Sequence, residues 1–270
     1  MDMDTVRARG LVLLGCGKMG SALLEGWLRQ GLPARSIRVI DPHPSVLVLR
    51  SGVEVNTPLP ESPAIVVIAV KPQIMAEALP GLRSLGNGAT LFLSIAAGTR
   101  ISQYEQVLGA KTPIVRAMPN TPAAIGRGIT AIIGNAQAGE PHLALAEALL
   151  SAVGQVVRLE GEHQMDAVTA VSGSGPAYVF HLIETLAAAG EAEGLPAPLA
   201  MQLARATVAG AGALAEAAQE SPAQLRSNVT SPGGTTAAAL EVLMDDAAGF
   251  PYLLKKAVKA AADRSRELGK

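Results

Sequence analysis

Three closely spaced glycines carry the clearest chemical signal in this sequence. Gly15, Gly17 and Gly20 form the pattern G-x-G-x-x-G, with Lys18 and Met19 before the last glycine, between an apolar run and a helical segment. There the first glycine permits a sharp turn, the second lets a phosphate approach the backbone, and the third lets the helix lie against the strand. The helix N-terminus offers free N–H groups to a pyrophosphate. The pattern predicts a dinucleotide-binding turn. The alternative is a tight turn with a structural role only.

An acidic residue follows at the spacing expected for such a turn. Asp41 ends the second apolar run, directly before Pro42. A carboxylate at this place accepts hydrogen bonds from the adenosine ribose hydroxyls and repels a 2′-phosphate. By itself Asp41 therefore favours NAD over NADP, although His43, Ser45 and Arg50 can still accommodate a phosphate. The alternative is that Asp41 only starts the Asp-Pro turn.

Two further strand ends belong to the same expected crevice. The run 65–70 ends in Lys71 and Pro72, and the run 91–95 is followed by two alanines and Gly98. Ligands of open α/β sheets lie outside the carboxyl ends of the strands, so these residues should line the nicotinamide half of the groove. Lys71 can contact a ribose hydroxyl or a phosphate, or it can simply be solvated.

A second group of chemistry-bearing residues lies far along the chain. Segment 228–236 places a glycine pair among serine and threonine hydroxyls at the start of an expected helix. Backbone N–H groups at such a helix start can converge on a carboxylate. The alternative is a helix cap with a flexible turn. Another Ser/Gly segment, 172–176, interrupts an otherwise helical region.

The elements that must position these residues change in character near residue 160. Before it, short β-branched runs alternate with helical or turn segments, which is typical of a largely parallel sheet covered by helices. Several runs are apolar at consecutive positions, which indicates strands buried on both faces. We predict an α/β Rossmann-type dinucleotide-binding domain over residues 1–160. Its expected strands are 11–14, 37–40, 65–70, 91–95, 114–117, 129–133 and 155–158.

Residues 161–270 have a different texture, rich in alanine and leucine and without strand signals. We predict an all-α C-terminal dimerisation domain that also binds substrate. Because this domain has few aromatic residues, it can build only a small hydrophobic core by itself. We therefore expect it to pack against a second copy in a homodimer. The alternative is that it caps the first domain in a monomer. Its expected helices are 164–171, 177–193, 198–219, 222–227, 236–244 and 249–268.

Composition excludes several classes of protein. Only 17% of the 270 residues are charged and the net charge is −1, which argues against a nucleic-acid partner. The longest apolar runs stop well short of the roughly 20 residues that span a bilayer, so no membrane partner is expected. The N-terminus lacks the apolar core of a signal peptide and Cys16 is the single cysteine, which predicts a cytoplasmic protein. The four histidines are scattered, so no metal site is expected.

Five motifs together resemble the pyrroline-5-carboxylate reductase family along the length of the chain. The last two, in this order, are the specific ones. The resemblance implies reduction of L-1-pyrroline-5-carboxylate to L-proline with NADPH or NADH, the final step of proline biosynthesis. It also implies an intertwined homodimer, often assembled into a ring of five dimers. The motifs are GCGKMG at 15–20, AVKPQ at 69–73, RAMPNTP at 116–122, VSGSGPAY at 171–178 and SPGGTT at 231–236.

The resemblance also assigns residues to roles. It implies that Ser231, Gly234 and Thr235 bind the substrate carboxylate, and that the Thr236 hydroxyl lies beside the ring nitrogen as the catalytic group. Asp41 departs from the family pattern, in which many members carry small or basic residues there and favour NADPH. The implied cofactor contacts are Gly15, Gly17, Lys18, Met19, Gly20, Asn56, Ala69, Val70, Lys71 and Pro72, with Asp41 added from its position.

Two rival functions follow from the same dinucleotide turn. A β-hydroxyacid dehydrogenase or imine reductase shares a Rossmann domain followed by helices. The hydroxyacid enzymes place a lysine shortly after a glycine cluster on the first long helix, whereas here Gly175 is followed by Pro176, Ala177 and Tyr178. A non-catalytic dinucleotide sensor would need the cofactor turn but not the 231–236 loop, so the loop favours catalysis.

Overall fold

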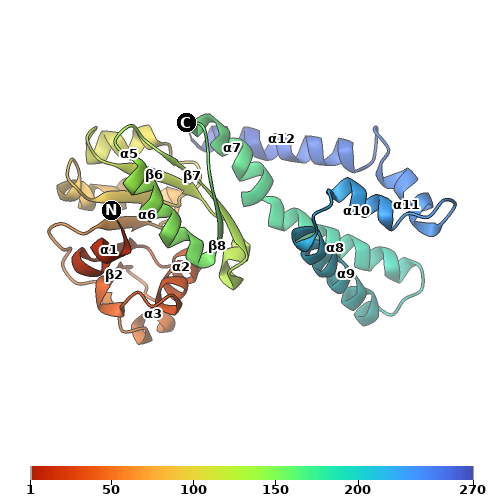
Figure 1. The fold of residues 1–270 in the computed structure, drawn as a ribbon, viewed down its shortest axis with the longest axis horizontal. Coiled ribbons are helices and arrows are strands. Elements are labelled where there is room, and N and C mark those ends of the chain that lie inside the picture. The colour runs from red at the N-terminus through yellow and green to blue at the C-terminus, as the bar shows by residue number, and fades with distance from the viewer. Residues whose placement is uncertain (1, 270) are drawn as a thin grey trace. The chain divides into compact units, whose positions relative to one another are not determined.

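An eight-stranded sheet forms the frame of the first compact unit in the computed structural model, which describes residues 2–269 (Figure 1). The strand order is β3-β2-β1-β4-β5-β6-β7-β8, and all neighbours are parallel except β6 and β7. The topology reverses between β1 and β4, where Rossmann folds bind their ligand. The strands are β1 (Leu11–Leu14), β2 (Ile37–Ile40), β3 (Glu54–Val55), β4 (Ile65–Ile68), β5 (Leu91–Ser94), β6 (Ile114–Met118), β7 (Gly128–Gly134) and β8 (Gly154–Arg158).

Two hydrophobic cores lie on the two faces of this sheet. Alternate residues of a strand point to opposite faces, so Leu11 and Leu13 join the core that contains Trp27, while Val12 and Leu14 join the core that contains Tyr104. Covering both faces explains why β1, β4 and β5 are apolar at consecutive positions. The predicted Rossmann-type fold is confirmed.

The helices of the first unit cover these cores. Helices α1, α2, α3 and α6 contribute to the Trp27 core, and α4 and α5 contribute to the Tyr104 core. The Trp27 indole donates to the carbonyl of Leu149 at 2.8 Å, which ties α2 to α6. The helices are α1 (Met3–Arg9), α2 (Lys18–Arg29), α3 (Val46–Arg50), α4 (Met75–Ala78), α5 (Ile101–Leu108), α6 (Glu140–Leu150) and α7 (Met165–Val168).

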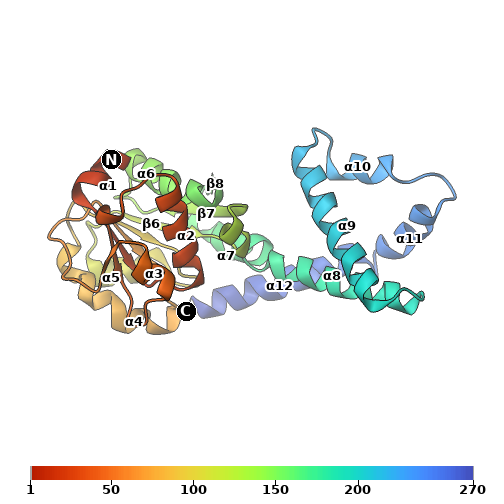
Figure 2. The same ribbon diagram turned by 90° about the horizontal axis from the view of Figure 1, so that it is seen from below.

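The second compact unit, Ser174–Ala261, is entirely helical apart from its connections. Helices α8 and α9 pack as a hairpin (Figure 2), with Ala187, Ala200 and Ala204 buried between them. Many large apolar side chains remain exposed within the single chain, among them Phe180 and Leu203. The helices are α8 (Gly175–Ala192), α9 (Ala197–Ala217), α10 (Pro222–Asn228), α11 (Thr235–Leu243) and α12 (Phe250–Leu268).

The first unit comprises Met1–Gly173 and also Ala262–Lys270, so α12 begins in the second unit and ends in the first. The sequence-based boundary at 160/161 stays a prediction. The interruption expected at 172–176 is present, because a π-helical turn, Thr169–Gly173, is followed by a bend at Ser174 before α8 begins at Gly175. Within residues 2–269, no helix has the length and apolar character needed to cross a membrane.

Candidate active site

The glycine turn lies between the ends of β1, β2 and β4. Gly15 has a φ of +83°, a conformation that disfavours any side chain. A Cβ on Gly15 would also lie 2.8 Å from a methyl carbon of Val70 and 3.0 Å from the carbonyl oxygen of Ala69. A Cβ on Gly20 would lie 2.8 Å from the carbonyl oxygen of Gly15, so the third glycine lets α2 sit on the turn. Two of the three glycines are therefore required by close packing.

Gly17 differs from the other two because it faces open space. A Cβ there would have no heavy atom within 4 Å, and no side chain caps the start of α2, which Gly17 precedes. Lys18 and Met19 form the first turn of that helix. Free N–H groups at the positive end of a helix dipole, beside empty space, suit a pyrophosphate. This geometry fits the dinucleotide predicted from the sequence.

Asp41 is bound to the glycine turn itself. One carboxylate oxygen accepts from the Cys16 N–H at 2.6 Å, and the other accepts from the His43 N–H at 2.8 Å. A carboxylate has about four acceptor positions, so two remain for ribose hydroxyls. The Cys16 thiol is buried, and burial raises its pKa, which keeps it neutral and unreactive as a filler.

Asn56 holds the backbone of Asp41 from the neighbouring strand connection. Its side-chain oxygen accepts from the Asp41 N–H at 2.9 Å, and its amide nitrogen donates to the Asp41 carbonyl at 2.8 Å. The Asn56 backbone has a φ of +53°. This pairing fixes the end of β2. It also uses both polar side-chain atoms of Asn56, the residue that the resemblance implies is a cofactor contact.

The ends of β4 and β5 complete the predicted cofactor crevice. Ala69 is joined to β1 through its N–H and the Leu14 carbonyl at 2.8 Å, so Ala69 and Val70 lie beside the glycine turn. Lys71 and Pro72 follow with exposed side chains. After β5, Ala96 and Gly98 are buried in the connection to α5. The structure thus brings the expected cofactor residues of the first unit to one edge of the sheet.

The expected substrate residues lie in the second unit, at the start of α11. Gly233 has a φ of +66°, and the Gly234 N–H donates to the Ser231 carbonyl at 3.0 Å, which closes a tight turn. No side chain caps α11, whose first residues are Thr235 and Thr236. The N-terminal N–H groups of this helix, with hydroxyls beside them, can therefore receive a carboxylate.

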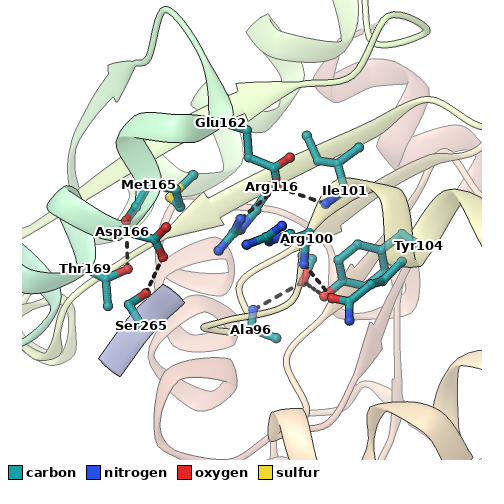
Figure 3. Close-up of polar contacts among 12 residues, drawn as sticks. Ala96, Arg100, Ile101, Tyr104, Arg116, Glu162, Met165, Asp166, Thr169 and Ser265 are labelled. Atoms are coloured by element: carbon teal, nitrogen blue, oxygen red, sulfur yellow. Dashed lines mark hydrogen bonds and ion pairs between the residues drawn. The ribbon is translucent and has the colours of Figure 1, made fainter. Parts of the chain in front are cut away.

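The polar cluster of Arg116, Glu162 and Ile101 was not predicted from the sequence (Figure 3). Arg116 on β6 is only 4% exposed, and its guanidinium forms an ion pair with Glu162 at 2.7 Å. The same Glu162 oxygen accepts from the Ile101 N–H at 2.9 Å, at the start of α5. An arginine inside a strand predicted to be buried on both faces is the signal that could have indicated such a partner.

The fold and this site define a class of protein. A Rossmann unit with an open phosphate-binding turn, joined to a helical unit with an uncapped anion-binding turn, is the architecture of a nicotinamide-dependent oxidoreductase acting on an anionic substrate. Among the residues described here, no group of three or more His, Cys, Asp or Glu side chains could hold a metal ion.

Comparisons with known proteins give the family. The model "Pyrroline-5-carboxylate reductase dimerisation" matches residues 162–268, and the model "NADP oxidoreductase coenzyme F420-dependent" matches residues 11–98. The pyrroline-5-carboxylate reductase of Pseudomonas aeruginosa is 40% identical over 264 residues, 96% of each chain. That of Synechocystis is 46% identical over 206 residues, 76% of this chain and 75% of the relative. The chain belongs to the pyrroline-5-carboxylate reductase family.

Solved structures agree with this assignment. The pyrroline-5-carboxylate reductase of Coxiella burnetii has a TM-score of 0.88 at 34% identity and covers 97% of this chain and 99% of its own. The Plasmodium falciparum pyrroline carboxylate reductase, solved with NADP bound, has a TM-score of 0.82 at 29% identity, with coverage of 97% and 98%. The predicted family, NAD(P)H-dependent enzyme class and reduction of pyrroline-5-carboxylate to proline are confirmed.

Proposed function

We propose that the chain divides this reaction between a dinucleotide-binding domain, residues 1–160, and a helical substrate domain, residues 161–270. When bound, the reduced nicotinamide supplies a hydride from its C4 to the C=N carbon of the cyclic imine. A protonated imine is already strongly electrophilic, so the protein mainly has to align the two reactants. Well-oriented proximity can lower the barrier by roughly 7–11 kcal/mol.

The uncapped start of α11 is the observation that carries the substrate assignment. Ser231, Gly234 and Thr235 surround the substrate carboxylate, which accepts from the Ser231 and Thr235 hydroxyls and from the free N–H groups of the first turn of α11, at the positive end of the helix dipole. The Thr236 hydroxyl forms a hydrogen bond with the ring nitrogen, which orients the imine and can relay a proton as the amine forms. No histidine or lysine acid is required by this arrangement.

The cofactor lies along the glycine turn and the ends of β2, β4 and β5. Gly15, Gly17, Lys18, Met19 and Gly20 bind its pyrophosphate, and Asp41 accepts from the adenosine ribose hydroxyls. The open space at Gly17 and the two unused acceptor positions of Asp41 support this placement. Asn56 holds the backbone of Asp41 in place through its two side-chain hydrogen bonds. Ala69, Val70, Lys71 and Pro72 border the nicotinamide half.

The helical domain joins two copies of the chain. The dimerisation model over residues 162–268 and the apolar side chains left exposed on α8 and α9 support a homodimer. By resemblance to the family, five dimers assemble into a ring. We place the enzyme in the cytoplasm, since its one cysteine suits a reducing compartment. Its ligands are small molecules rather than nucleic acid.

An absorbance assay tests this function against its rivals. NADH and NADPH oxidation is followed with pyrroline-5-carboxylate, and NAD and NADP reduction with a panel of β-hydroxyacids. We expect oxidation of reduced cofactor only with the imine. Turnover of a hydroxyacid alone would identify an alcohol dehydrogenase, and binding of cofactor without turnover of either substrate would identify a sensor.

A further inference from the structure

The connection between β5 and α5, residues 95–100, is the backbone on which the nicotinamide ring should rest. Small residues occupy its positions 96–98, and it follows β5, the strand next to β4, at the carboxyl edge of the sheet. Hydride transfer requires the reacting carbons about 3–3.5 Å apart, so the position of this backbone matters for turnover. Three contacts fix the position of this backbone.

Two of these contacts lie at the two ends of the connection, one near Ala96 and one at Ile101. The Ser94 hydroxyl forms a hydrogen bond with the hydroxyl of the fully buried Tyr104, with 2.5 Å between the two oxygens. The Ser94 hydroxyl oxygen also accepts from the Ala96 N–H at 3.2 Å. Burial raises the pKa of the Tyr104 hydroxyl, which therefore stays protonated. Glu162 holds the far end by accepting from the Ile101 N–H.

The third contact comes from the end of the chain. Gly98 has a φ of +79°, and a Cβ on it would lie 3.3 Å from the Cβ of Leu268 and 3.6 Å from the Leu268 carbonyl. A Cβ on Gly269 would lie 2.9 Å from the carbonyl oxygen of Gly98. The last turn of α12 therefore rests directly on the backbone of this connection, with no side chain between them at Gly98.

A hydrogen bond to α7 anchors that last turn. The Ser265 hydroxyl donates to a carboxylate oxygen of Asp166 on α7 at 2.6 Å, and Ser265 is only 4% exposed (Figure 3). The two residues are 99 positions apart. Asp166 precedes the point at which the chain enters the second unit, and Ser265 follows the point at which it returns. The bond thus fastens the returning helix to the unit that binds the cofactor.

We propose that Ser265 and Asp166 are positioning residues for hydride transfer. Their hydrogen bond holds the last turn of α12 against Gly98, and this turn in turn fixes the backbone beneath the nicotinamide. Neither residue touches cofactor or substrate in this account. The inference rests on the proposed placement of the nicotinamide at residues 96–98.

A purely structural role makes different predictions. If the bond only stabilised the fold, its loss would lower the melting temperature and leave the kinetics of the folded enzyme unchanged. If it positions the nicotinamide backbone, its loss slows the hydride step in folded enzyme. The primary deuterium isotope effect on kcat, measured with cofactor deuterated at the transferred position, separates these cases because it grows as hydride transfer becomes rate-limiting.

The test uses full-length Ser265→Ala with Ser151→Ala as the matched control. Ser151 is exposed and donates only to the Ala148 carbonyl at the end of α6. We expect Ser265→Ala to lower kcat roughly ten-fold and to raise the isotope effect, because small misplacements of reacting groups are costly. The KM for pyrroline-5-carboxylate should stay within about two-fold, since the carboxylate site at α11 is unchanged. The control should match wild type.

Two further variants keep the inference testable if Ser265→Ala folds poorly. Asp166→Asn retains an acceptor oxygen and should recover most of kcat, whereas Asp166→Ala should not. Gly269→Ala removes no hydrogen bond and inserts a methyl group against the Gly98 carbonyl, so it should raise the isotope effect as Ser265→Ala does. Folded Ser265→Ala or Gly269→Ala enzyme with unchanged kcat and isotope effect would overturn the inference. Wild-type enzyme that fails to reduce the imine would instead overturn the proposed function.

Discussion

The carboxylate of Asp41 accepts a hydrogen bond from the Cys16 N–H at 2.6 Å, so a residue at the end of β2 holds the dinucleotide turn that follows β1. This contact gives Asp41 two effects that act on different cofactors. Holding the turn matters for NADH and NADPH alike, whereas the negative charge favours the ribose hydroxyls of NADH and repels the 2′-phosphate of NADPH.

Asp41→Asn should therefore change cofactor preference. The amide keeps one acceptor oxygen and loses the charge, so kcat/KM for NADPH relative to NADH should rise about ten-fold, equivalent to about 1.4 kcal/mol of removed repulsion. Steady-state kinetics with both cofactors measure the ratio. Asp41→Ala serves as the control for the turn contact and should lower kcat/KM for both cofactors. An unchanged ratio in Asp41→Asn would remove the charge of Asp41 from cofactor selection.

Gly17→Val should abolish cofactor binding without unfolding the protein. The valine side chain would fill the open space over the first turn of α2 and keep the phosphate away from the N–H groups there. A hydrogen bond to a charged group contributes about 1.5–3 kcal/mol, so loss of two such bonds should weaken cofactor binding about 100-fold or more. Calorimetric titration with NADH and NADPH measures the affinity, and thermal melting checks the fold. Gly81→Val is the matched control, because a Cβ on Gly81 also has nothing within 4 Å. Retained affinity in Gly17→Val would place the pyrophosphate elsewhere.

Thr236→Ala should lower turnover more than it weakens cofactor binding. A hydrogen bond to the ring nitrogen that strengthens as the amine forms contributes about 1.5–3 kcal/mol, so kcat should fall about 10- to 100-fold. Thr236→Ser keeps the hydroxyl and should retain most of the activity. Equal kcat in Thr236→Ala and wild type would exclude Thr236 from the mechanism.

Glu162→Ala should destabilise the first unit. It leaves the buried Arg116 guanidinium and the Ile101 N–H without their carboxylate. Breaking a fully buried pair costs about 3–5 kcal/mol, and because the Glu162 side chain is 31% exposed we expect about 2 kcal/mol. Urea unfolding measures the free energy, with Glu267→Ala in the exposed pair to Arg264 as control. A loss no larger than that of the control would show that water replaces the carboxylate.

Local pattern was sufficient to predict the strands that build the crevice. The runs 11–14 and 37–40 coincide with β1 and β2. β1 is covered on both faces and is apolar throughout, whereas β2 alternates between buried and half-buried residues. Two of the three glycines are required by the geometry of the turn, since Gly15 has a positive φ and both Gly15 and Gly20 are closely packed.

Other features depended on contacts between distant residues and could not be predicted from local pattern. The short helix α1 and the two-residue strand β3 carry little periodicity of their own. The Ser265–Asp166 bond joins residues 99 positions apart, and nothing near either residue identifies its partner. For the same reason, the return of residues 262–269 to the first unit was not expected.

Transfer of deuterium from cofactor to product tests the central claim most directly. The enzyme is incubated with pyrroline-5-carboxylate and reduced cofactor that carries deuterium at the transferred position of C4, and the product is examined by mass spectrometry and NMR. We predict L-proline with one deuterium on the ring carbon that formed the C=N bond. Cofactor oxidation without deuterated proline, or no oxidation with either NADH or NADPH, would contradict the proposed function.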